Sequence, residues 1–382
     1  MLPFTVIDGL GHSEIVMTAL LASFAFAMFV ANPALGRISD KLGRRPVLLL
    51  SLGVGTVAHL WFAVSNDIMQ MFAARTIAGL ATGNIGVIQS IIADRTSPQD
   101  RARTMGFLGA AIGAGFVTGP ALGGLLSGIG SGPVHQTPFL IAAAFSALSF
   151  ILAIRLKETG TLSRSVVTQG VFSEYVKTVL SGQIGWFAAS FFCLNLAFAQ
   201  VEVSYVLLVR DLLGFGARQT GWLFIYIGVL IIIVQGGLIS RAVLRFGEMK
   251  TIIAGVALLA SGQLLTVALA FGDALGLVIM VGPILLSTTL VCVGFAFTNP
   301  TLTASASKAA SARNMGGSLG FIQGCGSIGQ VLGLVSAGPF NAFGGSVASF
   351  GFGTAVTCCL LVFILMMLSR QHRQQKMADG VC

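Results

Sequence analysis

Residues 36–46 read Gly36-Arg37-Ile38-Ser39-Asp40-Lys41-Leu42-Gly43-Arg44-Arg45-Pro46, a short basic turn between two long apolar runs. In so apolar a chain, a charged segment of this length belongs at a membrane face, because charges are costly within hydrocarbon. Four of the eleven residues are Lys or Arg, and an excess of these residues marks the cytoplasmic side. The stretch therefore sets the expected orientation of every other segment.

The composition is that of a membrane protein. Hydrophobic residues make up 55% of the 382 residues and charged residues only 9%, whereas about 25% of a soluble domain is charged. Repeated apolar runs of about 20 residues indicate transmembrane helices. The 49 glycines fit this interpretation, since small residues let membrane helices approach closely. The expected fold class is an all-α polytopic membrane protein.

Composition also argues against several other classes. The net charge of +9 does not indicate a nucleic-acid partner, because the charges lie in short segments between spans rather than on one face. The six cysteines lie mostly within apolar runs, without the spacing of a metal site or a disulfide framework. The sequence has no HExxH or Walker motif. We therefore expect no metal, no cofactor and no enzymatic activity.

The apolar runs predict eleven spans, with boundaries uncertain by a few residues. They cover residues 13–36, 46–65, 68–93, 104–130, 137–155, 180–208, 218–240, 250–271, 275–299, 314–340 and 345–369. Nineteen of the 22 Lys and Arg residues fall in segments on one side of these spans. The other side has Arg210 and Arg218, and Arg75 lies within a span. This asymmetry orients the chain and predicts a cytoplasmic C-terminus.

Parity places Met1 on the outer side, because the first span must enter from outside to reach the basic stretch. The beginning of the sequence has neither a basic region nor a long apolar region, so it does not indicate a cleaved signal peptide. The expected explanation is a missing first helix, either because the start was assigned too late or because the chain is truncated.

The polar stretch 156–179 divides the spans into five and six. We therefore expect an N-terminal transmembrane bundle over 1–155, a cytoplasmic linker over 156–179, a C-terminal bundle over 180–369 and a cytoplasmic tail over 370–382. An internal repeat supports this division. Ala102-Arg103-Thr104-Met105-Gly106 recurs as Ala312-Arg313-Asn314-Met315-Gly316, and the basic stretch recurs weakly around Gly237-Leu238-Ile239-Ser240-Arg241 and Arg245-Phe246-Gly247-Glu248.

These motifs resemble those of the major facilitator superfamily over the whole chain. The spacing Gly36-x-x-x-Asp40-x-x-Gly43-Arg44-Arg45 is similar to the signature between helices 2 and 3, and Arg75-x-x-x-Gly79 resembles the helix 4 motif. The segment Gly115–Gly124 resembles the helix 5 antiporter motif, and the tracts Gly43–Leu52 and Ile92–Asp94 resemble the tetracycline-efflux branch. The resemblance implies two six-helix bundles, here without the first helix.

The resemblance also implies a function. The leading hypothesis is proton-coupled export of a small apolar or amphipathic compound, drug-like or tetracycline-like, by alternating access. The expected partners are that substrate, protons and the lipid bilayer. The expected location is a cell membrane, for a bacterium the inner one, and the resemblance implies a monomer. The alternatives are a metabolite, sugar or metal-chelate carrier of the same fold, or a transport-inactive truncated homologue.

The first group of candidate residues forms a conformational gate. Arg44 is expected to pair with Asp94, and Asp40 to face the N-terminal end of the span near Arg313, where a helix dipole favours an anion. These contacts would close the cytoplasmic side. A solvated basic loop is the alternative, although it leaves the acid and the glycines unexplained. The gate comprises Gly36, Asp40, Gly43, Arg44, Arg45 and Asp94.

The antiporter motif forms the second group. Gly115, Gly119 and Gly123 recur every fourth residue, so they share one helix face and predict a groove for a partner helix. Pro120 is expected to bend that helix. The resemblance implies that this face, with Gly124, seals the two halves against leak.

The third group comprises candidates for coupling or substrate contact. Arg75 is basic within a span and is expected to face a cavity or a carboxylate. Glu202 is the expected proton carrier, since burial would raise its pKa. Amides that would line a cavity, or alternatively bond helix to helix, are Asn84, Asn195, Gln200 and Asn299.

Overall fold

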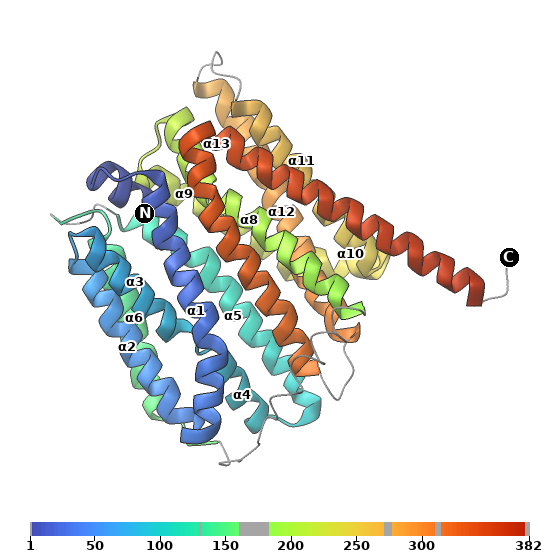
Figure 1. The fold of residues 1–382 in the computed structure, drawn as a ribbon, viewed down its shortest axis with the longest axis horizontal. Helices are drawn as coiled ribbons and strands as arrows, with labels where there is room; N and C mark the ends of the chain where they lie inside the picture. Colours follow the sequence, from blue (N-terminus) through green and yellow to red (C-terminus); the bar gives the residue numbers. More distant parts are fainter. Residues whose placement is uncertain are drawn as a thin grey trace. The chain divides into compact units, whose positions relative to one another are not determined.

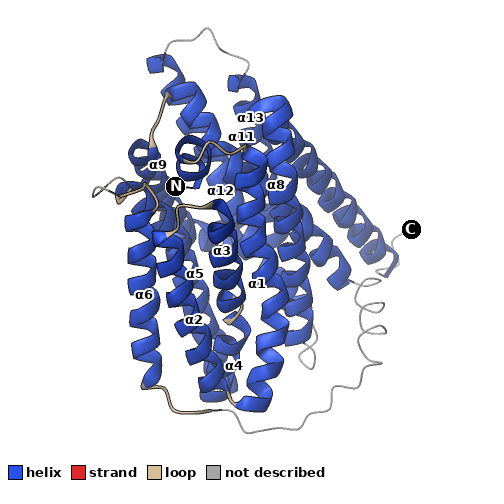
Figure 2. Cartoon of the chain, turned by 60° about the vertical axis from the view of Figure 1, so that its left-hand side comes forward, coloured by secondary structure: helices blue, strands red, loops and turns tan. Residues whose placement is uncertain are grey.

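The structure is a computed structural model that describes residues 2–127, 129, 132–159, 183–270, 277–309 and 315–378. Within these ranges the chain is helical and contains no strand (Figures 1 and 2). The all-helical architecture expected from the sequence is confirmed. The chain divides into two compact units, Met1–Gln169 with Phe215–Tyr226, and Gly170–Gly214 with Ile227–Cys382.

The elements up to residue 154 belong to the first unit. They are η1 (Phe4–Gly9), a short π-helix, α1 (Glu14–Leu42), α2 (Arg44–Val64), α3 (Ile68–Thr82), α4 (Ile85–Arg95), α5 (Pro98–Leu125) and α6 (Gln136–Ile154). Ser13 caps α1 by accepting from the Val16 N–H at 3.5 Å, and Asp67 caps α3 by accepting from the Gln70 N–H at 3.1 Å. α2 packs against α3 and α6, and α1 packs against α3.

The elements from residue 183 onward belong mainly to the second unit. They are α8 (Gln183–Leu213), α9 (Ala217–Ile233), the π-helical η2 (Val234–Leu238), α10 (Ile239–Phe246), α11 (Glu248–Ala270), α12 (Leu277–Ala309) and α13 (Met315–Ala378). The first part of α9 belongs to the first unit. α13 packs against α8 and α11, and α11 packs against α12.

Glycines set how closely these helices approach. A Cβ on Gly79 of α3 would lie 2.4 Å from the Phe24 carbonyl oxygen of α1. A Cβ on Gly294 of α12 would lie 2.4 Å from the Leu259 nitrogen of α11. Larger side chains would separate both helix pairs, which is the packing that the high glycine content predicts.

The observed helices modify the expected spans in two places. The span expected over 68–93 is interrupted at Gly83 and Asn84, between α3 and α4. The spans expected over 314–340 and 345–369 both lie in α13, which departs from helical geometry at Gly345, with φ of 63°. Glycine adopts this conformation without the steric cost that a Cβ brings.

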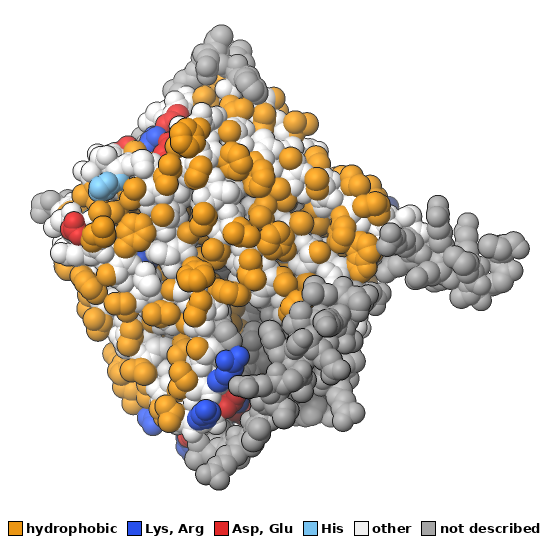
Figure 3. All heavy atoms as spheres, in the orientation of Figure 1, with side chains coloured by type: hydrophobic (Ala, Val, Ile, Leu, Met, Phe, Trp, Pro, Cys, Tyr) orange, Lys and Arg blue, Asp and Glu red, His pale blue; other side chains and the backbone are white. Residues whose placement is uncertain are grey.

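Nine helical segments in the described part of the chain are long and apolar enough to cross a membrane. Because two expected spans lie in one of these segments, and α5 is not among the nine, this number is lower than the eleven expected. The face seen in Figure 3 is largely apolar. Lys and Arg side chains gather at the lower end of that view, where Figure 1 shows the ends of α1 and α2.

Candidate functional site

The stretch that the sequence presents as a charged loop is almost entirely helical. α1 continues to Leu42 and α2 begins at Arg44, so the loop expectation is wrong for all but Gly43. Gly43 has φ of 100° and ψ of 152°, and its N–H donates to the Ser39 carbonyl at 3.1 Å, closing the last turn of α1. A single residue suffices to join the helices because glycine tolerates positive φ. We call this junction, from Ser39 to Arg45, the first corner.

Arg44 collects the polar groups of the first corner. Its guanidinium donates to Ser39 Oγ at 2.9 Å and pairs with Asp40. Its Nε lies 3.5 Å from Asp94 Oδ2, at the end of α4. The structure thus brings Arg44 and Asp94 together as the sequence predicts. The Asp40 carboxylate pairs with Arg44 across the Gly43 junction, from α1 to α2, and Arg313, near its expected partner, lies outside the described residues.

Solvent exposure limits the strength of these pairs. The side chains of Asp40 and Asp94 are 48% and 32% exposed, while Arg44 is 17% exposed. Ion pairs of this kind contribute about 0–1 kcal/mol each, because water screens them. The first corner is therefore held by contacts that a modest free energy can break.

Glu158, which the sequence analysis placed within a linker, completes the first corner. Its two carboxylate oxygens accept the backbone N–H groups of Arg44 and Arg45, at 2.9 and 3.1 Å. An anion at this position satisfies unpaired donors and complements the helix dipole of α2. A Cβ on Gly43 would lie 2.7 Å from Glu158 Oε2. The backbone conformation at position 43 favours glycine, and an added Cβ would also displace the Glu158 carboxylate.

Neighbouring contacts tie the end of α6 to the same place. The Arg45 guanidinium donates to the Ile154 carbonyl at 2.8 Å, and Arg95 donates to the Lys157 carbonyl at 2.8 Å. Thr159 Oγ1 donates to Asp94 Oδ2 at 3.3 Å. The available signal for Glu158 was an acid directly after an apolar span that packs against α2. Its bonding to α2 depends on how α6 packs, which the local sequence does not encode.

Arg75 lies on α3 among aromatic rings. Its guanidinium carbon is 4.7 Å from the centre of the Phe24 ring, 5.8 Å from that of Phe139 and 5.9 Å from that of Phe62. Rings from α1, α2 and α6 thus meet this side chain, and a cation over an aromatic face is stabilised by about 0.5–2 kcal/mol. The sequence predicted a cavity or a carboxylate and did not identify the aromatic surroundings.

The antiporter motif on α5 makes a close helix contact at Gly124. A Cβ on Gly124 would lie 2.2 Å from the Cα of Gly221 on α9. At Gly115 and Gly119 an added Cβ would meet nothing within 4 Å among the described residues. Pro120 lies inside α5. The helix-to-helix approach is therefore at Gly124 and Gly221, and the sequence analysis did not select Gly221.

Two candidates on α8 face different surroundings. Gln200 is fully buried, donating from Nε2 to the Gly333 carbonyl at 2.9 Å and Ser336 Oγ at 2.8 Å, and accepting from Ser349 Oγ at 2.6 Å. It therefore bonds helix to helix rather than lining a cavity. Glu202 is exposed, whereas its expected role as proton carrier assumed burial.

The remaining amides lie between α3 and α4, on α8 and on α12. Asn84 is buried and its Nδ2 donates to Ser51 Oγ of α2 at 2.8 Å. Asn195 donates to the Phe191 carbonyl of its own helix at 2.9 Å. Asn299 is half-buried on α12. Sequence reasoning did not find the polar chain that Gln200 joins, in which Ser204 donates to Ser349 and Asn341 donates to Ser204.

Comparison with known proteins follows this geometry. A family model described as Major Facilitator Superfamily matches residues 1–334. The class C tetracycline resistance protein of Escherichia coli is 33% identical over 261 residues, which are 66% of this chain and 65% of that protein. Multidrug resistance protein 1 of Bacillus subtilis is 28% identical over 342 residues, 87% of this chain and 82% of that protein. The chain spans just under two thirds of the class C protein's length.

Solved structures share the fold. The D-xylose-proton symporter superposes with a TM-score of 0.76 at 16% identity, covering 92% of this chain and 87% of that one. The human organic anion transporter MFSD10 gives a TM-score of 0.68 at 24% identity, covering 92% and 84%. These likenesses show a common fold, and the family model confirms the resemblance that the motifs indicate.

Proposed function

The chain belongs to the Major Facilitator Superfamily, and on this premise we propose that it exports a small apolar or amphipathic compound in exchange for protons. The observation that carries the direction of transport is the similarity to tetracycline-resistance and multidrug-resistance proteins. Because this similarity covers only part of the class C protein, the substrate is proposed as a class, drug-like or tetracycline-like, rather than as one compound.

The first corner would serve as a latch in alternating access. Its ion pairs are partly exposed, so they form and break at low cost. Asp40 and Asp94 both meet Arg44, which connects α1 with α4. Transport would require this connection to change when the protein switches state, because a ligand drives a transition only through contacts that differ between states.

The close approach of Gly124 and Gly221 would form and separate during transport. It lies at the C-terminal end of α5, which the sequence predicts to face outward. Glycines leave both backbones free to touch and to separate without moving side chains out of the way. This gives the antiporter motif a role at Gly124, while Gly115 and Gly119 remain open to a partner.

Coupling of export to proton movement would use charged side chains at fixed positions on the helices. Glu202 lies two residues after Gln200, which α13 holds by three hydrogen bonds. We propose that proton binding at Glu202 competes with substrate binding. We also propose that the positive charge of Arg75 contributes to coupling in the N-terminal bundle. The falling proton gradient would then supply the work of export.

The test is drug susceptibility in a bacterial strain that lacks its own drug pumps. Cells expressing the chain should survive higher concentrations of at least one tetracycline or other amphipathic drug than cells with an empty vector. Asp40→Asn removes the charge that pairs with Arg44 and should lower survival to the empty-vector level at equal abundance in the membrane.

Asp67→Asn is the matched control. Asp67 lies at the start of α3 and its role is to cap that helix, which asparagine does equally well. This variant should keep wild-type resistance. Wild-type resistance in Asp40→Asn would refute the latch, and no protection against any drug would favour a metabolite, sugar or metal-chelate carrier instead.

A further inference from the structure

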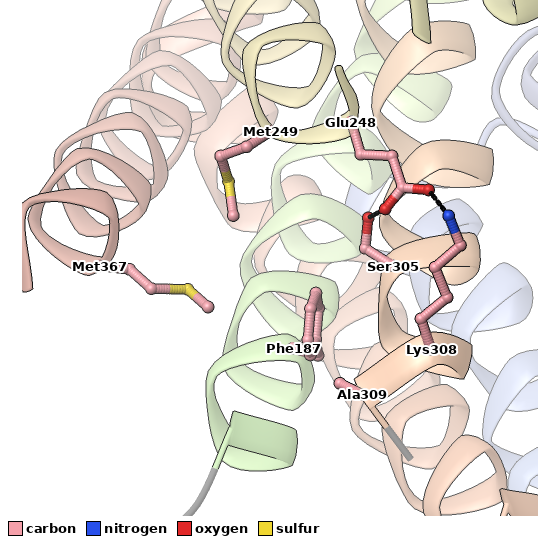
Figure 4. Close-up of a pocket in the computed structure, with 7 residues that line it drawn as sticks. All are labelled: Phe187, Glu248, Met249, Ser305, Lys308, Ala309 and Met367. Atoms are coloured by element: carbon pink, nitrogen blue, oxygen red, sulfur yellow. Dashed lines mark hydrogen bonds and ion pairs between the residues drawn. The ribbon is translucent and has the colours of Figure 1, made fainter. Parts of the chain in front are cut away.

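A hollow of about 310 Å³ lies within the second unit. Four helices form it, α8, α11, α12 and α13, and Figure 4 shows two kinds of wall. Glu248, Ser305 and Lys308 make the polar side, and Phe187, Met249 and Met367 make the apolar side. Such a division suits an amphipathic ligand, because each part of it finds surroundings of its own kind.

The polar wall presents an ammonium group that is already held in place. Glu248 accepts from Ser305 Oγ at 2.9 Å and pairs with Lys308 Nζ. The Lys308 side chain is nonetheless 71% exposed, whereas Glu248 is 24% exposed. An ammonium carries three donors, so the pair with Glu248 leaves donors for an acceptor in the hollow.

The apolar wall is formed by side chains from the protein interior. Phe187 and Met367 are 5% and 6% exposed, and Met249 completes the wall from the first turn of α11. Methionine side chains adapt to irregular apolar shapes. A hydrocarbon chain therefore fits this side of the hollow better than a fully hydrated ion does.

Basic residues near Glu248 in the sequence lie outside the lining of the hollow. Arg241, Arg245 and Lys250 flank Glu248 along the chain, and all three are exposed. The sequence predicts this side of the membrane to be cytoplasmic, where anionic lipid headgroups attract basic residues.

The level of the hollow matches that of a lipid headgroup. Glu248 is the first residue of one candidate span, and Lys308 lies two residues after another ends at Ala306. Positions at the ends of apolar spans lie at the boundary between hydrocarbon and water. A phospholipid has its phosphate at this level and its acyl chains on the apolar side.

We propose that this hollow binds an anionic phospholipid whose headgroup carries hydroxyls, the chemistry of phosphatidylglycerol. The phosphate accepts hydrogen bonds from Lys308 Nζ, a glycerol hydroxyl donates to the Glu248 carboxylate, and acyl carbons pack on Met249 and Met367. The site is independent of the transported compound, and the Glu248–Lys308 pair distinguishes it from a general basic surface.

The experiment measures the thermal-unfolding midpoint of the purified full chain in detergent as phospholipid is added. Phosphatidylglycerol should raise the midpoint in a saturable way, and phosphatidylcholine with the same acyl chains should not. Lys308→Ala should weaken lipid binding and so raise the half-saturating lipid concentration about tenfold. This is the effect expected from losing one charge-assisted hydrogen bond. Lys308→Arg keeps the charge and should keep the response.

Lys250→Ala is the matched control, since Lys250 is an exposed lysine of the same unit that does not line the hollow. It should respond like the wild type. Equal weakening in both variants would mean a diffuse basic surface and would overturn the proposal. So would equal stabilisation by phosphatidylcholine, or a full response to inorganic phosphate or glycerol phosphate, which have the anion without the acyl chains.

Discussion

Gly43 and Gly247 turn the chain between two helices in the same way, but the residues that follow them carry opposite charges. Gly43 has φ of 100° and ψ of 152°, and Gly247 has φ of 84° and ψ of 163°. Each donates its N–H back to close the preceding turn, to Ser39 at 3.1 Å and to Val243 at 2.8 Å. The junction at Gly247, from Val243 to Glu248, is the second corner.

The difference lies in where the balancing charge comes from. At the first corner, α2 begins with two arginines, and the anion at its N-terminus is Glu158, from after α6. At the second corner, α11 begins with its own anion, Glu248, which pairs with Lys308 of α12. The repeated backbone thus carries two charge arrangements. The first depends on three carboxylates from separate segments, and the second on one ion pair between α11 and α12.

The glycines themselves should show the largest difference. Gly43→Ala forces positive φ on an L residue, costing about 1–3 kcal/mol, and also displaces Glu158, which lies 2.7 Å from the added Cβ. Gly247→Ala has the conformational cost alone, since an added Cβ there meets nothing within 4 Å among the described residues. The unfolding midpoint in detergent should fall further for Gly43→Ala. Equal falls would mean that Glu158 does not crowd Gly43.

Replacing the two acids, Glu158 and Glu248, should change the free energy of unfolding by amounts that differ less than those of the two glycine variants. Glu158→Ala removes the acceptor of two N–H groups and should cost about 1 kcal/mol, as a lost helix cap does. Glu248→Ala removes a partly exposed ion pair and should cost about 0.5 kcal/mol. Unfolding midpoints of the two variants, measured side by side, check the order. A larger fall for Glu248→Ala would show that the second corner is the more strongly held.

Lys308→Ala should have the smallest effect on stability. The side chain is 71% exposed, and such residues contribute within about 0.5 kcal/mol when replaced. Raising the salt concentration should remove even this difference, because salt screens exposed charges. A midpoint that falls as far as in Glu158→Ala, at any salt concentration, would contradict the view that this pair is solvent-screened.

At the first corner, the sequence predicts the ion pair of Arg44 better than it predicts the path of the backbone. The pair of Arg44 with Asp94 follows from placing both residues at the same membrane face. The helical path through Asp40 and Lys41 does not follow, because charges at a helix end look the same in sequence as charges in a loop. Glu158 depends on the packing of α6 against α2, which lies outside any local pattern.

The sequence also does not show which face of an apolar helix is buried. Gln200 and Glu202 are two residues apart on α8, yet Gln200 is fully buried and Glu202 is exposed. In an apolar helix both faces look alike in sequence, so periodicity does not assign the buried one. The antiporter motif shows the same limit, because the four-residue spacing groups Gly115, Gly119 and Gly123 on one face, whereas the close approach is at Gly124.

The most direct measurement is drug uptake by inside-out membrane vesicles containing the wild type, Asp40→Asn or Glu248→Gln, using the compound with the largest protection in cells. The account predicts wild-type uptake that requires a proton gradient and stops when an uncoupler is added, background uptake for Asp40→Asn and near wild-type uptake for Glu248→Gln. Wild-type uptake that persists with an uncoupler, or full uptake by Asp40→Asn, would contradict it.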